Sequence, residues 1–341
     1  MTNFVIGIAG TAKNTGKTTA LSALLSEIRR KPGPTAALTS IGYDGEHFDN
    51  VTGLPKPRIS VDENEILAVA ERCLHSGDAA LEVLQKTDIP TPLGKIVLGR
   101  VTRPGKIVLA GPNNRRDLAA VIDRLSELGA GLTIVDGALS RIAPLVAAHS
   151  LLLCTGAARN NDIGLLAAET KLAVEILKTP VLEEQGRAAR LTSILNQAGF
   201  DQFTEAVRGA ETICLEGIFS ELYYSKFLGQ AGPLAGKRLI FADSIKLLLS
   251  GEARATRRLI DGLEAKGMRV GVSAGLNLAA VTVNPYYPKY RYDLKEYEAT
   301  YVDKDELLAR LSADLADLAV PVFDVVRQGG RGIYEALAGK A

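Results

Sequence analysis

The sequence predicts an α/β fold with a doubly wound, mostly parallel sheet and helices on both faces. Short apolar runs alternate with segments of helical periodicity over the whole 341 residues, as expected when crossover helices connect parallel strands. A glycine-rich turn joins the first apolar run to the first helical segment. The chain has 33 glycines, few aromatic residues and no Trp, a composition that suits tight turns between strands and helices.

The first part of the chain reads as one strand–helix–strand unit. Residues 4–9 are apolar and rich in β-branched side chains, which is typical of a strand buried on both faces. Residues 20–28 carry apolar side chains at helical spacing, and the Pro and Gly residues at 32–34 are expected to stop this helix. Residues 36–41 then predict a second strand, which completes the unit.

The same alternation continues to residue 177. Asp62 and Glu65 resemble a capping pair and predict a helix that carries residues 66–73. Residues 95–101 and 106–110 predict a hairpin that turns at Arg103-Pro104-Gly105. Strands are expected at 132–136 and 150–154, and helices around 118–125 and 165–177.

The second half of the chain predicts further strands and helices, beginning with an irregular stretch. Residues 191–195 suggest a helix and residues 212–218 a strand. Strands are then expected at 239–242, 269–273, 280–283 and 320–325, and helices at 244–249, 257–266 and 304–315. We therefore expect a first domain over residues 1–180. Residues 181–341 form a further α/β region, which either stands alone or continues the same sheet.

Composition excludes several classes of protein. Forty basic residues nearly balance 39 acidic ones, so a nucleic-acid partner has no support from charge. Cys73, Cys154 and Cys214 lie far apart and only three His occur, so neither a disulfide framework nor a zinc site is expected. No apolar stretch approaches the roughly 20 residues that a membrane helix needs. We expect a cytoplasmic protein without a membrane partner.

The segment over residues 10–19 is the motif that carries chemistry. Its backbone N–H groups can form a nest for an anion, and the following helix adds the positive end of its dipole. The expected cofactor is ATP with Mg²⁺, with the Lys17 ammonium on the β- and γ-phosphates and the Thr18 hydroxyl on the metal. The P-loop consensus asks for Gly or Ala where Thr11 stands. The candidate cofactor-binding residues are Gly10, Thr11, Ala12, Lys13, Asn14, Thr15, Gly16, Lys17, Thr18 and Thr19.

Two acids are expected to complete this site. Asp136 ends a predicted strand and is the candidate that holds Mg²⁺ together with Thr18. Asp44 follows the second strand, where ligands bind in open α/β sheets, and is the candidate for orienting water or metal. Lys17 and Asp44 are therefore the catalytic candidates. A solvated Asp-Gly turn at Asp44 is the alternative.

The loop resembles that of known P-loop NTPases. Residues 13–19 are similar to the loops of dethiobiotin synthetase, the Min/ParA ATPases and the GTP-binding protein of molybdopterin-guanine dinucleotide biosynthesis. The signature lysine of the Min/ParA proteins falls at Ala12. The resemblance therefore does not imply a dimer that inserts this lysine across its interface, although a homodimer of another kind stays open.

A longer series of motifs resembles one family more specifically. Residues 10–19, 43–46, 56–59, 91–94 and 136–141 occur in the order seen in the P-loop subunit of the lysine 5,6-aminomutase reactivase. The resemblance implies an ATPase that restores an adenosylcobalamin-dependent aminomutase together with a second ATPase subunit. The chain has no Asp-x-His-x-x-Gly run of the kind that binds cobalamin.

Other functions stay open at this point. An ATP-dependent small-molecule synthetase or kinase, a GTP-binding cofactor-biosynthesis protein and a nucleotide-binding regulator all fit the loop. The guanine-selecting Asn/Thr-Lys-x-Asp pattern is absent, which makes ATP the default while GTP stays open. Asn284 lies at a predicted strand end where a nucleotide base could be read. Six of the ten tyrosines fall within residues 286–301, and we expect an irregular segment packed on the sheet edge, with partner docking or base stacking as the alternative.

Overall fold

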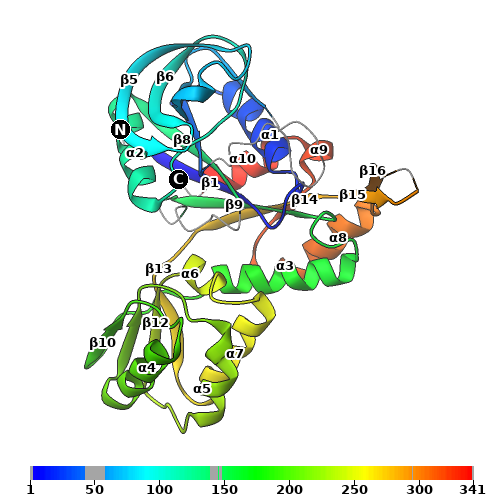
Figure 1. Ribbon diagram of the computed structural model, residues 1–341. Coiled ribbons are helices and arrows are strands. Elements are labelled where there is room, and N and C mark those ends of the chain that lie inside the picture. The colour runs from blue at the N-terminus through cyan, green and yellow to red at the C-terminus, as the bar shows by residue number, and fades with distance from the viewer. Residues whose placement is uncertain (1–2, 43–57, 139–144, 146–147, 294, 340–341) are drawn as a thin grey trace. The chain divides into compact units, whose positions relative to one another are not determined.

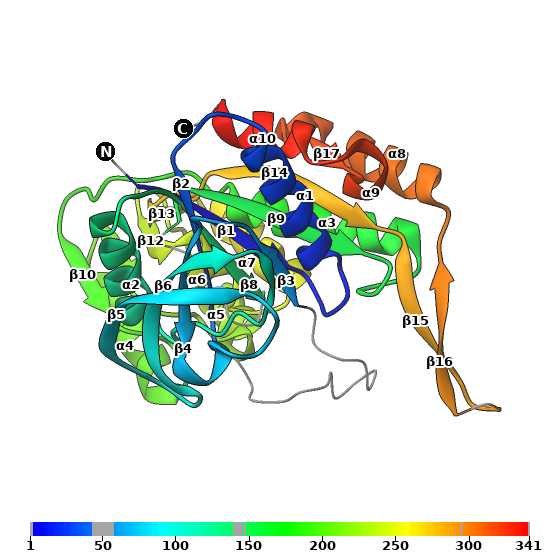
Figure 2. The ribbon, with the colours of Figure 1, turned by 90° about the horizontal axis from the view of Figure 1, so that it is seen from above.

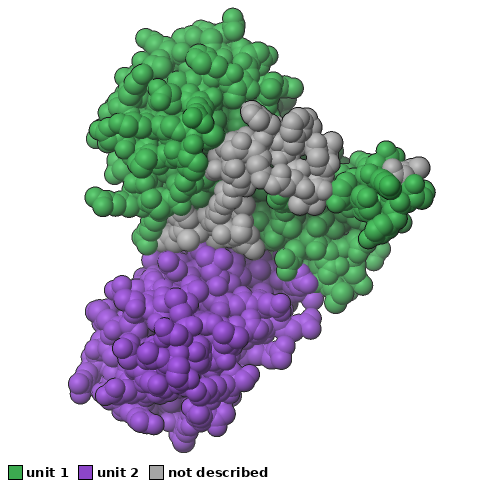
Figure 3. Space-filling model, in the orientation of Figure 1, with its two compact units in different colours: residues 1–166, 278–341 green, residues 167–277 purple. Residues whose placement is uncertain are grey.

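The computed structural model describes residues 3–42, 58–138, 145, 148–293 and 295–339. The chain divides into two compact units: unit 1 comprises residues 1–166 and 278–341, and unit 2 comprises residues 167–277 (Figure 3). The sequence instead predicted a single boundary near residue 180. The difference arises because strand β14 (Leu278–Asn284) pairs with β9 (Ser150–Gly156), which returns the end of the chain to the first sheet.

Unit 1 is a mixed α/β unit with a large, mostly parallel sheet (Figure 1). Besides β9 and β14, its strands are β1 (Phe4–Gly10), β2 (Thr35–Ser40), β3 (Ile59–Val61), β4 (Ile66–Ala70), β5 (Ala80–Thr91), β6 (Gly94–Arg103), β7 (Gly105–Ile107), β8 (Ala130–Ala138), β15 (Tyr286–Arg291), β16 (Glu296–Tyr301) and β17 (Val322–Phe323). Over the described residues the large sheet has nine strands in the order β17-β14-β9-β1-β8-β2-β4-β6-β5. The strands from β17 to β4 are parallel, and β6 and β5 add an antiparallel hairpin at one edge.

Helices pack on this sheet and bury two separate clusters of apolar side chains. The helices are α1 (Lys17–Arg29), α2 (Arg115–Glu127), α3 (Ile163–Leu177), which runs on into unit 2, α8 (Lys304–Asp314), α9 (Val325–Gln328) and α10 (Arg331–Ala338). Leu38 of β2 joins a cluster with Leu24 of α1 and Ile333 of α10, whereas its neighbour Ala37 joins a cluster with Val121 of α2. Successive residues of a strand point to opposite faces, so β2 contributes to both clusters.

The helix predicted over residues 66–73 is wrong, because residues 66–70 form β4. All five residues of β4 are buried, and a short continuous apolar run cannot be told from a buried helix by its periodicity. Asp62 and Glu65 form a turn instead of a cap: the Asp62 N–H donates to Glu65 Oε2 at 2.8 Å. The Glu65 carboxylate also accepts two hydrogen bonds from Arg29, which ties this turn to α1.

The hairpin predicted around Arg103-Pro104-Gly105 is also misplaced. The hairpin of the structure joins β5 to β6 and turns at residues 92–93. Thr91 closes this turn, since its hydroxyl donates to the Gly94 carbonyl at 2.6 Å. At Gly105 the chain instead leaves β6 for β7, which pairs with β3 in a separate small ladder.

Unit 2 has its own parallel sheet, so it does not continue the sheet of unit 1. Its strands are β10 (Ala188–Leu191), β11 (Thr212–Leu215), β12 (Arg238–Asp243) and β13 (Arg269–Ala274), and its helices besides the end of α3 are α4 (Gln197–Gly209), α5 (Tyr224–Gln230), α6 (Ser244–Leu248) and α7 (Ala253–Ala265). The strands lie side by side in chain order. The helix suggested at 191–195 is wrong: β10 ends at Leu191, and α4 begins only after Asn196, whose side chain caps it.

The tyrosine-rich segment is regular, contrary to the prediction. Residues 286–291 and 296–301 form the two antiparallel strands of the β15–β16 hairpin, and Figures 1 and 2 show it extending away from the large sheet of unit 1. Tyr301 remains 64% exposed and Tyr297 41% exposed, so these rings are not packed on the sheet edge.

Candidate functional site

The loop predicted to bind phosphate connects β1 to α1 and folds back closely on the end of the strand. Gly10 is required by this approach, since a Cβ there would lie 2.6 Å from Thr15 Oγ1 and 2.8 Å from Lys17 Cγ. Asn14 and Gly16 adopt left-handed backbone conformations, with φ of 61° and 87°. The Thr11 N–H donates to the Cys154 carbonyl at 2.9 Å, which holds the start of the loop against β9.

The first turn of α1 is not neutralised by its own side chains. Gly16 is the N-cap and has no side chain to accept a hydrogen bond, and the first turn contains no acidic residue. Lys17 and Thr18 are half-buried at this turn, whereas Thr19 and Lys13 are exposed. The positive end of the helix dipole and the Lys17 charge therefore act at the same place, which favours an anion.

Asp136 lies on β8, the strand next to β1, and its carboxylate is incompletely satisfied. In the parallel register its Cα is opposite Ile8 of β1 and Ser40 of β2. Its Oδ1 atom is buried and has no hydrogen-bond partner within the described part of the chain. Burial raises the pKa of Asp136 to about 6, and the nearby Lys17 charge acts in the opposite direction. A buried carboxylate oxygen without a hydrogen-bond partner can accept a hydrogen bond from water bound to a cation or from another donor.

The thiol of Cys154 lies in the same electrostatic surroundings. Cys154 is fully buried on β9, as predicted, and its Cα pairs with that of Gly10. Burial raises the pKa of this thiol to about 12, which keeps it protonated and unreactive at neutral pH. Cys73 and Cys214 are also buried free thiols.

The structure places three of the predicted site residues near one another, and a fourth, Asp44, lies outside the described residues. Lys17 and Thr18 are the first two residues of α1, the helix that follows β1. Asp136 lies near the carboxyl end of β8, the parallel neighbour of β1. Asp44 falls outside the described residues, so its catalytic role stays a prediction. Among the described residues no group of three or more His, Cys, Asp or Glu side chains could hold a metal ion. A metal here would depend on phosphate and water for its remaining ligands.

Two polar residues beside the loop had not been assigned to it. The Thr155 hydroxyl, near the end of β9, accepts a hydrogen bond from the Thr11 hydroxyl at 3.0 Å. Asn284, at the end of β14, donates from Nδ2 to the Asn14 carbonyl at 2.8 Å. The sequence marked Asn284 as a strand-end residue where a nucleotide base could be read, and did not link it to the loop. Because the carboxyl ends of parallel strands meet at one edge, polar residues at these ends were the signal that could have linked it to the loop.

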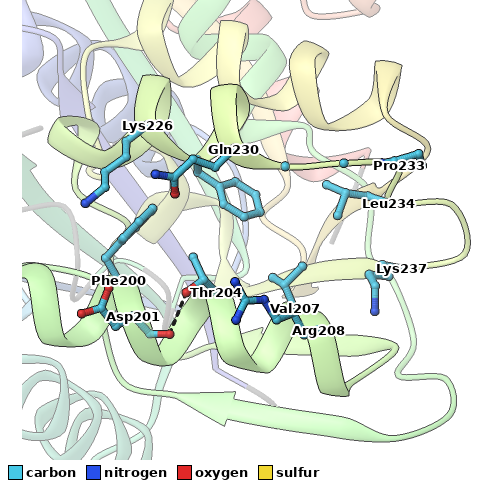
Figure 4. A pocket seen from close by; sticks show the side chains of 13 residues that line it. Phe200, Asp201, Thr204, Val207, Arg208, Lys226, Gln230, Pro233, Leu234 and Lys237 are labelled. Atoms are coloured by element: carbon cyan, nitrogen blue, oxygen red, sulfur yellow. Dashed lines mark hydrogen bonds between the residues drawn. The ribbon is translucent and has the colours of Figure 1, made fainter.

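A separate hollow lies in unit 2, between α4, α5 and residues 231–237 (Figure 4). Its volume is about 470 Å³, within the range of roughly 300–1,000 Å³ that is common for small-molecule sites. Arg208, Lys226 and Lys237 line it together with one acid, Asp201. The Lys226 ammonium lies 4.8 Å from the centroid of the Phe200 ring. This charge balance favours an anionic over a cationic occupant. These residues are scattered in the sequence, which gave no sign of the hollow.

The unusual pKa of Asp136 predicts how the nucleotide-free protein responds to pH. A carboxyl group with a raised pKa in the folded state contributes its full stability below its ordinary value of 3.8, and this stability is lost as the pH rises through about 6. We expect Asp136→Asn to increase the free energy of unfolding at pH 7.5 by up to about 3 kcal/mol, and to change it little at pH 4.

This expectation can be checked by thermal melting of both proteins across this pH range in EDTA without nucleotide. The matched control is Asp123→Asn, which changes an exposed carboxylate on α2. Its free energy of unfolding should equal that of the wild type at every pH. A stabilisation by Asp136→Asn that is the same at pH 4 and pH 7.5 would contradict the assigned desolvation.

No helix in the described ranges is both long and apolar enough to cross a membrane. Comparison with protein families finds no family that matches the chain, and comparison with curated proteins finds none that is significantly similar. The function proposed below therefore rests on the sequence motifs and on the geometry of the loop and its neighbouring strands.

Proposed function

We propose that residues 10–19 form a P-loop that binds the triphosphate of a nucleotide with Mg²⁺, within a doubly wound α/β unit. The observation that carries this proposal is the buried Oδ1 atom of Asp136, which has no partner in the described part of the chain and lies on the strand beside β1. An unsatisfied buried carboxylate oxygen costs free energy, and water molecules around a bound cation would satisfy it. The loop packs tightly against Gly10, and the first turn of α1 has no side-chain cap. These two features supply the site for the anionic phosphates.

Each residue of the proposed site has a distinct task. The backbone N–H groups of the loop and first turn receive phosphate oxygens, and the Lys17 ammonium neutralises charge on the β- and γ-phosphates. The Thr18 hydroxyl and Asp136 would hold Mg²⁺, Asp136 through water. The metal would neutralise charge on the phosphates during phosphoryl transfer. Asp44 would orient the attacking water, and ATP is the proposed nucleotide.

The proposed role of nucleotide turnover is to act on a partner enzyme. The motifs of residues 10–19, 43–46, 56–59, 91–94 and 136–141 resemble the P-loop subunit of the lysine 5,6-aminomutase reactivase. The exposed β15–β16 hairpin offers a surface on which a partner protein could dock. We propose reactivation of an adenosylcobalamin-dependent aminomutase, together with a second ATPase subunit, as the specific function.

The lysine of the loop gives the first test. We expect Lys17→Ala to weaken binding of Mg-ATP by about 100-fold, because it removes a charge-assisted contact to phosphate worth roughly 2–3 kcal/mol. Isothermal titration calorimetry measures the affinity, and a melting curve shows that the fold is kept. Lys304→Ala is the matched control, since Lys304 is also the first residue of a helix. Wild-type affinity in Lys17→Ala would rule out this P-loop assignment.

The second test separates metal binding from nucleotide binding. We expect Asp136→Asn to raise the Mg²⁺ concentration needed for half-maximal ATP binding by at least about tenfold, because the amide loses the charge that attracts the hydrated cation. Affinity for ATP in EDTA should stay the same or rise slightly. An unchanged Mg²⁺ titration would remove Asp136 from the metal site, and Asp123→Asn again serves as the control.

The third test concerns the partner. We expect slow release of phosphate from ATP by the full chain alone, and stimulation of at least about tenfold by inactivated lysine 5,6-aminomutase with the second ATPase subunit. Aminomutase activity should recover with wild-type protein but not with Lys17→Ala. ADP formation that instead requires a small acid or alcohol would point to a synthetase or kinase and contradict the reactivase function.

A further inference from the structure

Asn284 joins the candidate P-loop to the tyrosine-rich hairpin through the two ends of one carboxamide. Its Nδ2 donates to the carbonyl of Asn14 at 2.8 Å, which bridges 270 positions of sequence. Its Oδ1 accepts from the Tyr286 N–H, the first residue of β15, at 3.2 Å. The backbone of Asn284 is itself fixed, because its carbonyl accepts from the Ala157 N–H at 2.9 Å.

On the loop side, Asn284 holds the part of the loop with the least ordinary backbone. Asn14 has a φ of 61° and Gly16 a φ of 87°, so both are left-handed. In anion nests, left-handed residues alternate with right-handed ones. A Cβ at Gly16 would lie 3.2 Å from the Cβ of Asn284, so the two segments are in close contact. The hydrogen bond also occupies the Asn14 carbonyl oxygen, an acceptor that would otherwise repel a phosphate.

On the other side lies a hairpin with one uncharged face. Strand register sets Tyr286, Pro288 and Tyr290 directly opposite Tyr301, Ala299 and Tyr297. Successive residues of a strand point to opposite faces, so these six share one face and the charged residues share the other.

Ring contacts link the two strands along this face. The ring centroids of Tyr286 and Tyr301 are 5.7 Å apart, and those of Tyr290 and Tyr297 are 5.1 Å apart. A two-stranded hairpin has little stability of its own, so the position of β15–β16 depends on how its base is held. The base is held by Asn284 and by the Val302 N–H, which donates to the Pro285 carbonyl at 3.0 Å.

We propose that Asn284 is a positioning residue that couples occupancy of the 10–19 loop to the position of the β15–β16 hairpin. Both ends of its carboxamide are engaged, so a shift of Asn14 on binding phosphate moves the carboxamide together with the Tyr286 N–H that it holds. This movement changes the support of the hairpin base. The coupling is reciprocal, so a partner docked on the tyrosine face changes the nucleotide affinity. This inference rests on the proposed nucleotide binding.

The absence of Trp from the chain allows a direct measurement. Tyr301→Trp places a single fluorescent reporter on the hairpin base, opposite Tyr286 and at a site that is 64% exposed. Addition of Mg-ATP to the full-length protein should change its emission, while calorimetry on the same sample reports binding independently. Tyr297→Trp provides a second reporter on the same face if the first variant does not fold.

Two substitutions of Asn284 distinguish its coupling of the loop to the hairpin from its support of the hairpin base alone. Asn284→Ala removes both bonds, whereas Asn284→Asp keeps the acceptor for Tyr286 and removes the donor to Asn14. We expect both variants to lose the ATP-induced emission change at saturating Mg-ATP. Only Asn284→Ala should alter the emission of the nucleotide-free protein. The control Gln85→Ala, which removes an exposed carboxamide from edge strand β5, should behave as wild type.

The outcomes distinguish this inference from the proposed function. Heat of binding without any emission change would overturn the coupling and leave nucleotide binding intact. An emission change that persists in Asn284→Ala would also overturn the role of Asn284. Absence of any heat of binding with the wild-type protein would overturn both.

Discussion

The parallel pairing of β1 with β8 on one side and β9 on the other is the constraint on which the candidate site depends. It places the loop that follows β1 among the ends of its neighbours, and β14 extends the same edge. The chain can approach so closely only because Gly10 has no side chain to collide with Thr15 and Lys17. The Asp136 carboxylate, with its buried Oδ1 atom, and the fixed carboxamide of Asn284 then both lie close to one short loop.

Much of unit 1 could be predicted from the sequence because its strands are apolar, short and bounded by clear turn residues. The first strand–helix–strand unit and the strands around Asp136 and Cys154 are confirmed within a few residues. The expectation that Asp136 lies near Lys17 and Thr18 followed from the loop motif, because a P-loop calls for an acid at the end of a nearby strand. Nucleotide binding itself stays a prediction, and so does the role of Asp44.

The parts that could not be predicted share a physical cause. A fully buried strand such as β4 has no polar face, so its pattern does not differ from that of a buried helix. The return of β14 to the first sheet and the bond from Asn284 to Asn14 depend on contacts across most of the chain, which local patterns do not contain. The tyrosine face of the hairpin became visible only when strand register paired Tyr290 with Tyr297.

The insertion of unit 2 between β9 and β14 has a consequence for the order of assembly. These strands are neighbours in the sheet, yet the whole of unit 2 is synthesised between them. Until residues 278–284 leave the ribosome, β9 lacks its partner on one side and has an open edge, the kind of surface on which chains pair wrongly. Unit 2, whose strands pair in chain order, can fold through local contacts during this interval. The loop of residues 10–19 is therefore among the first segments made and among the last to receive its final support.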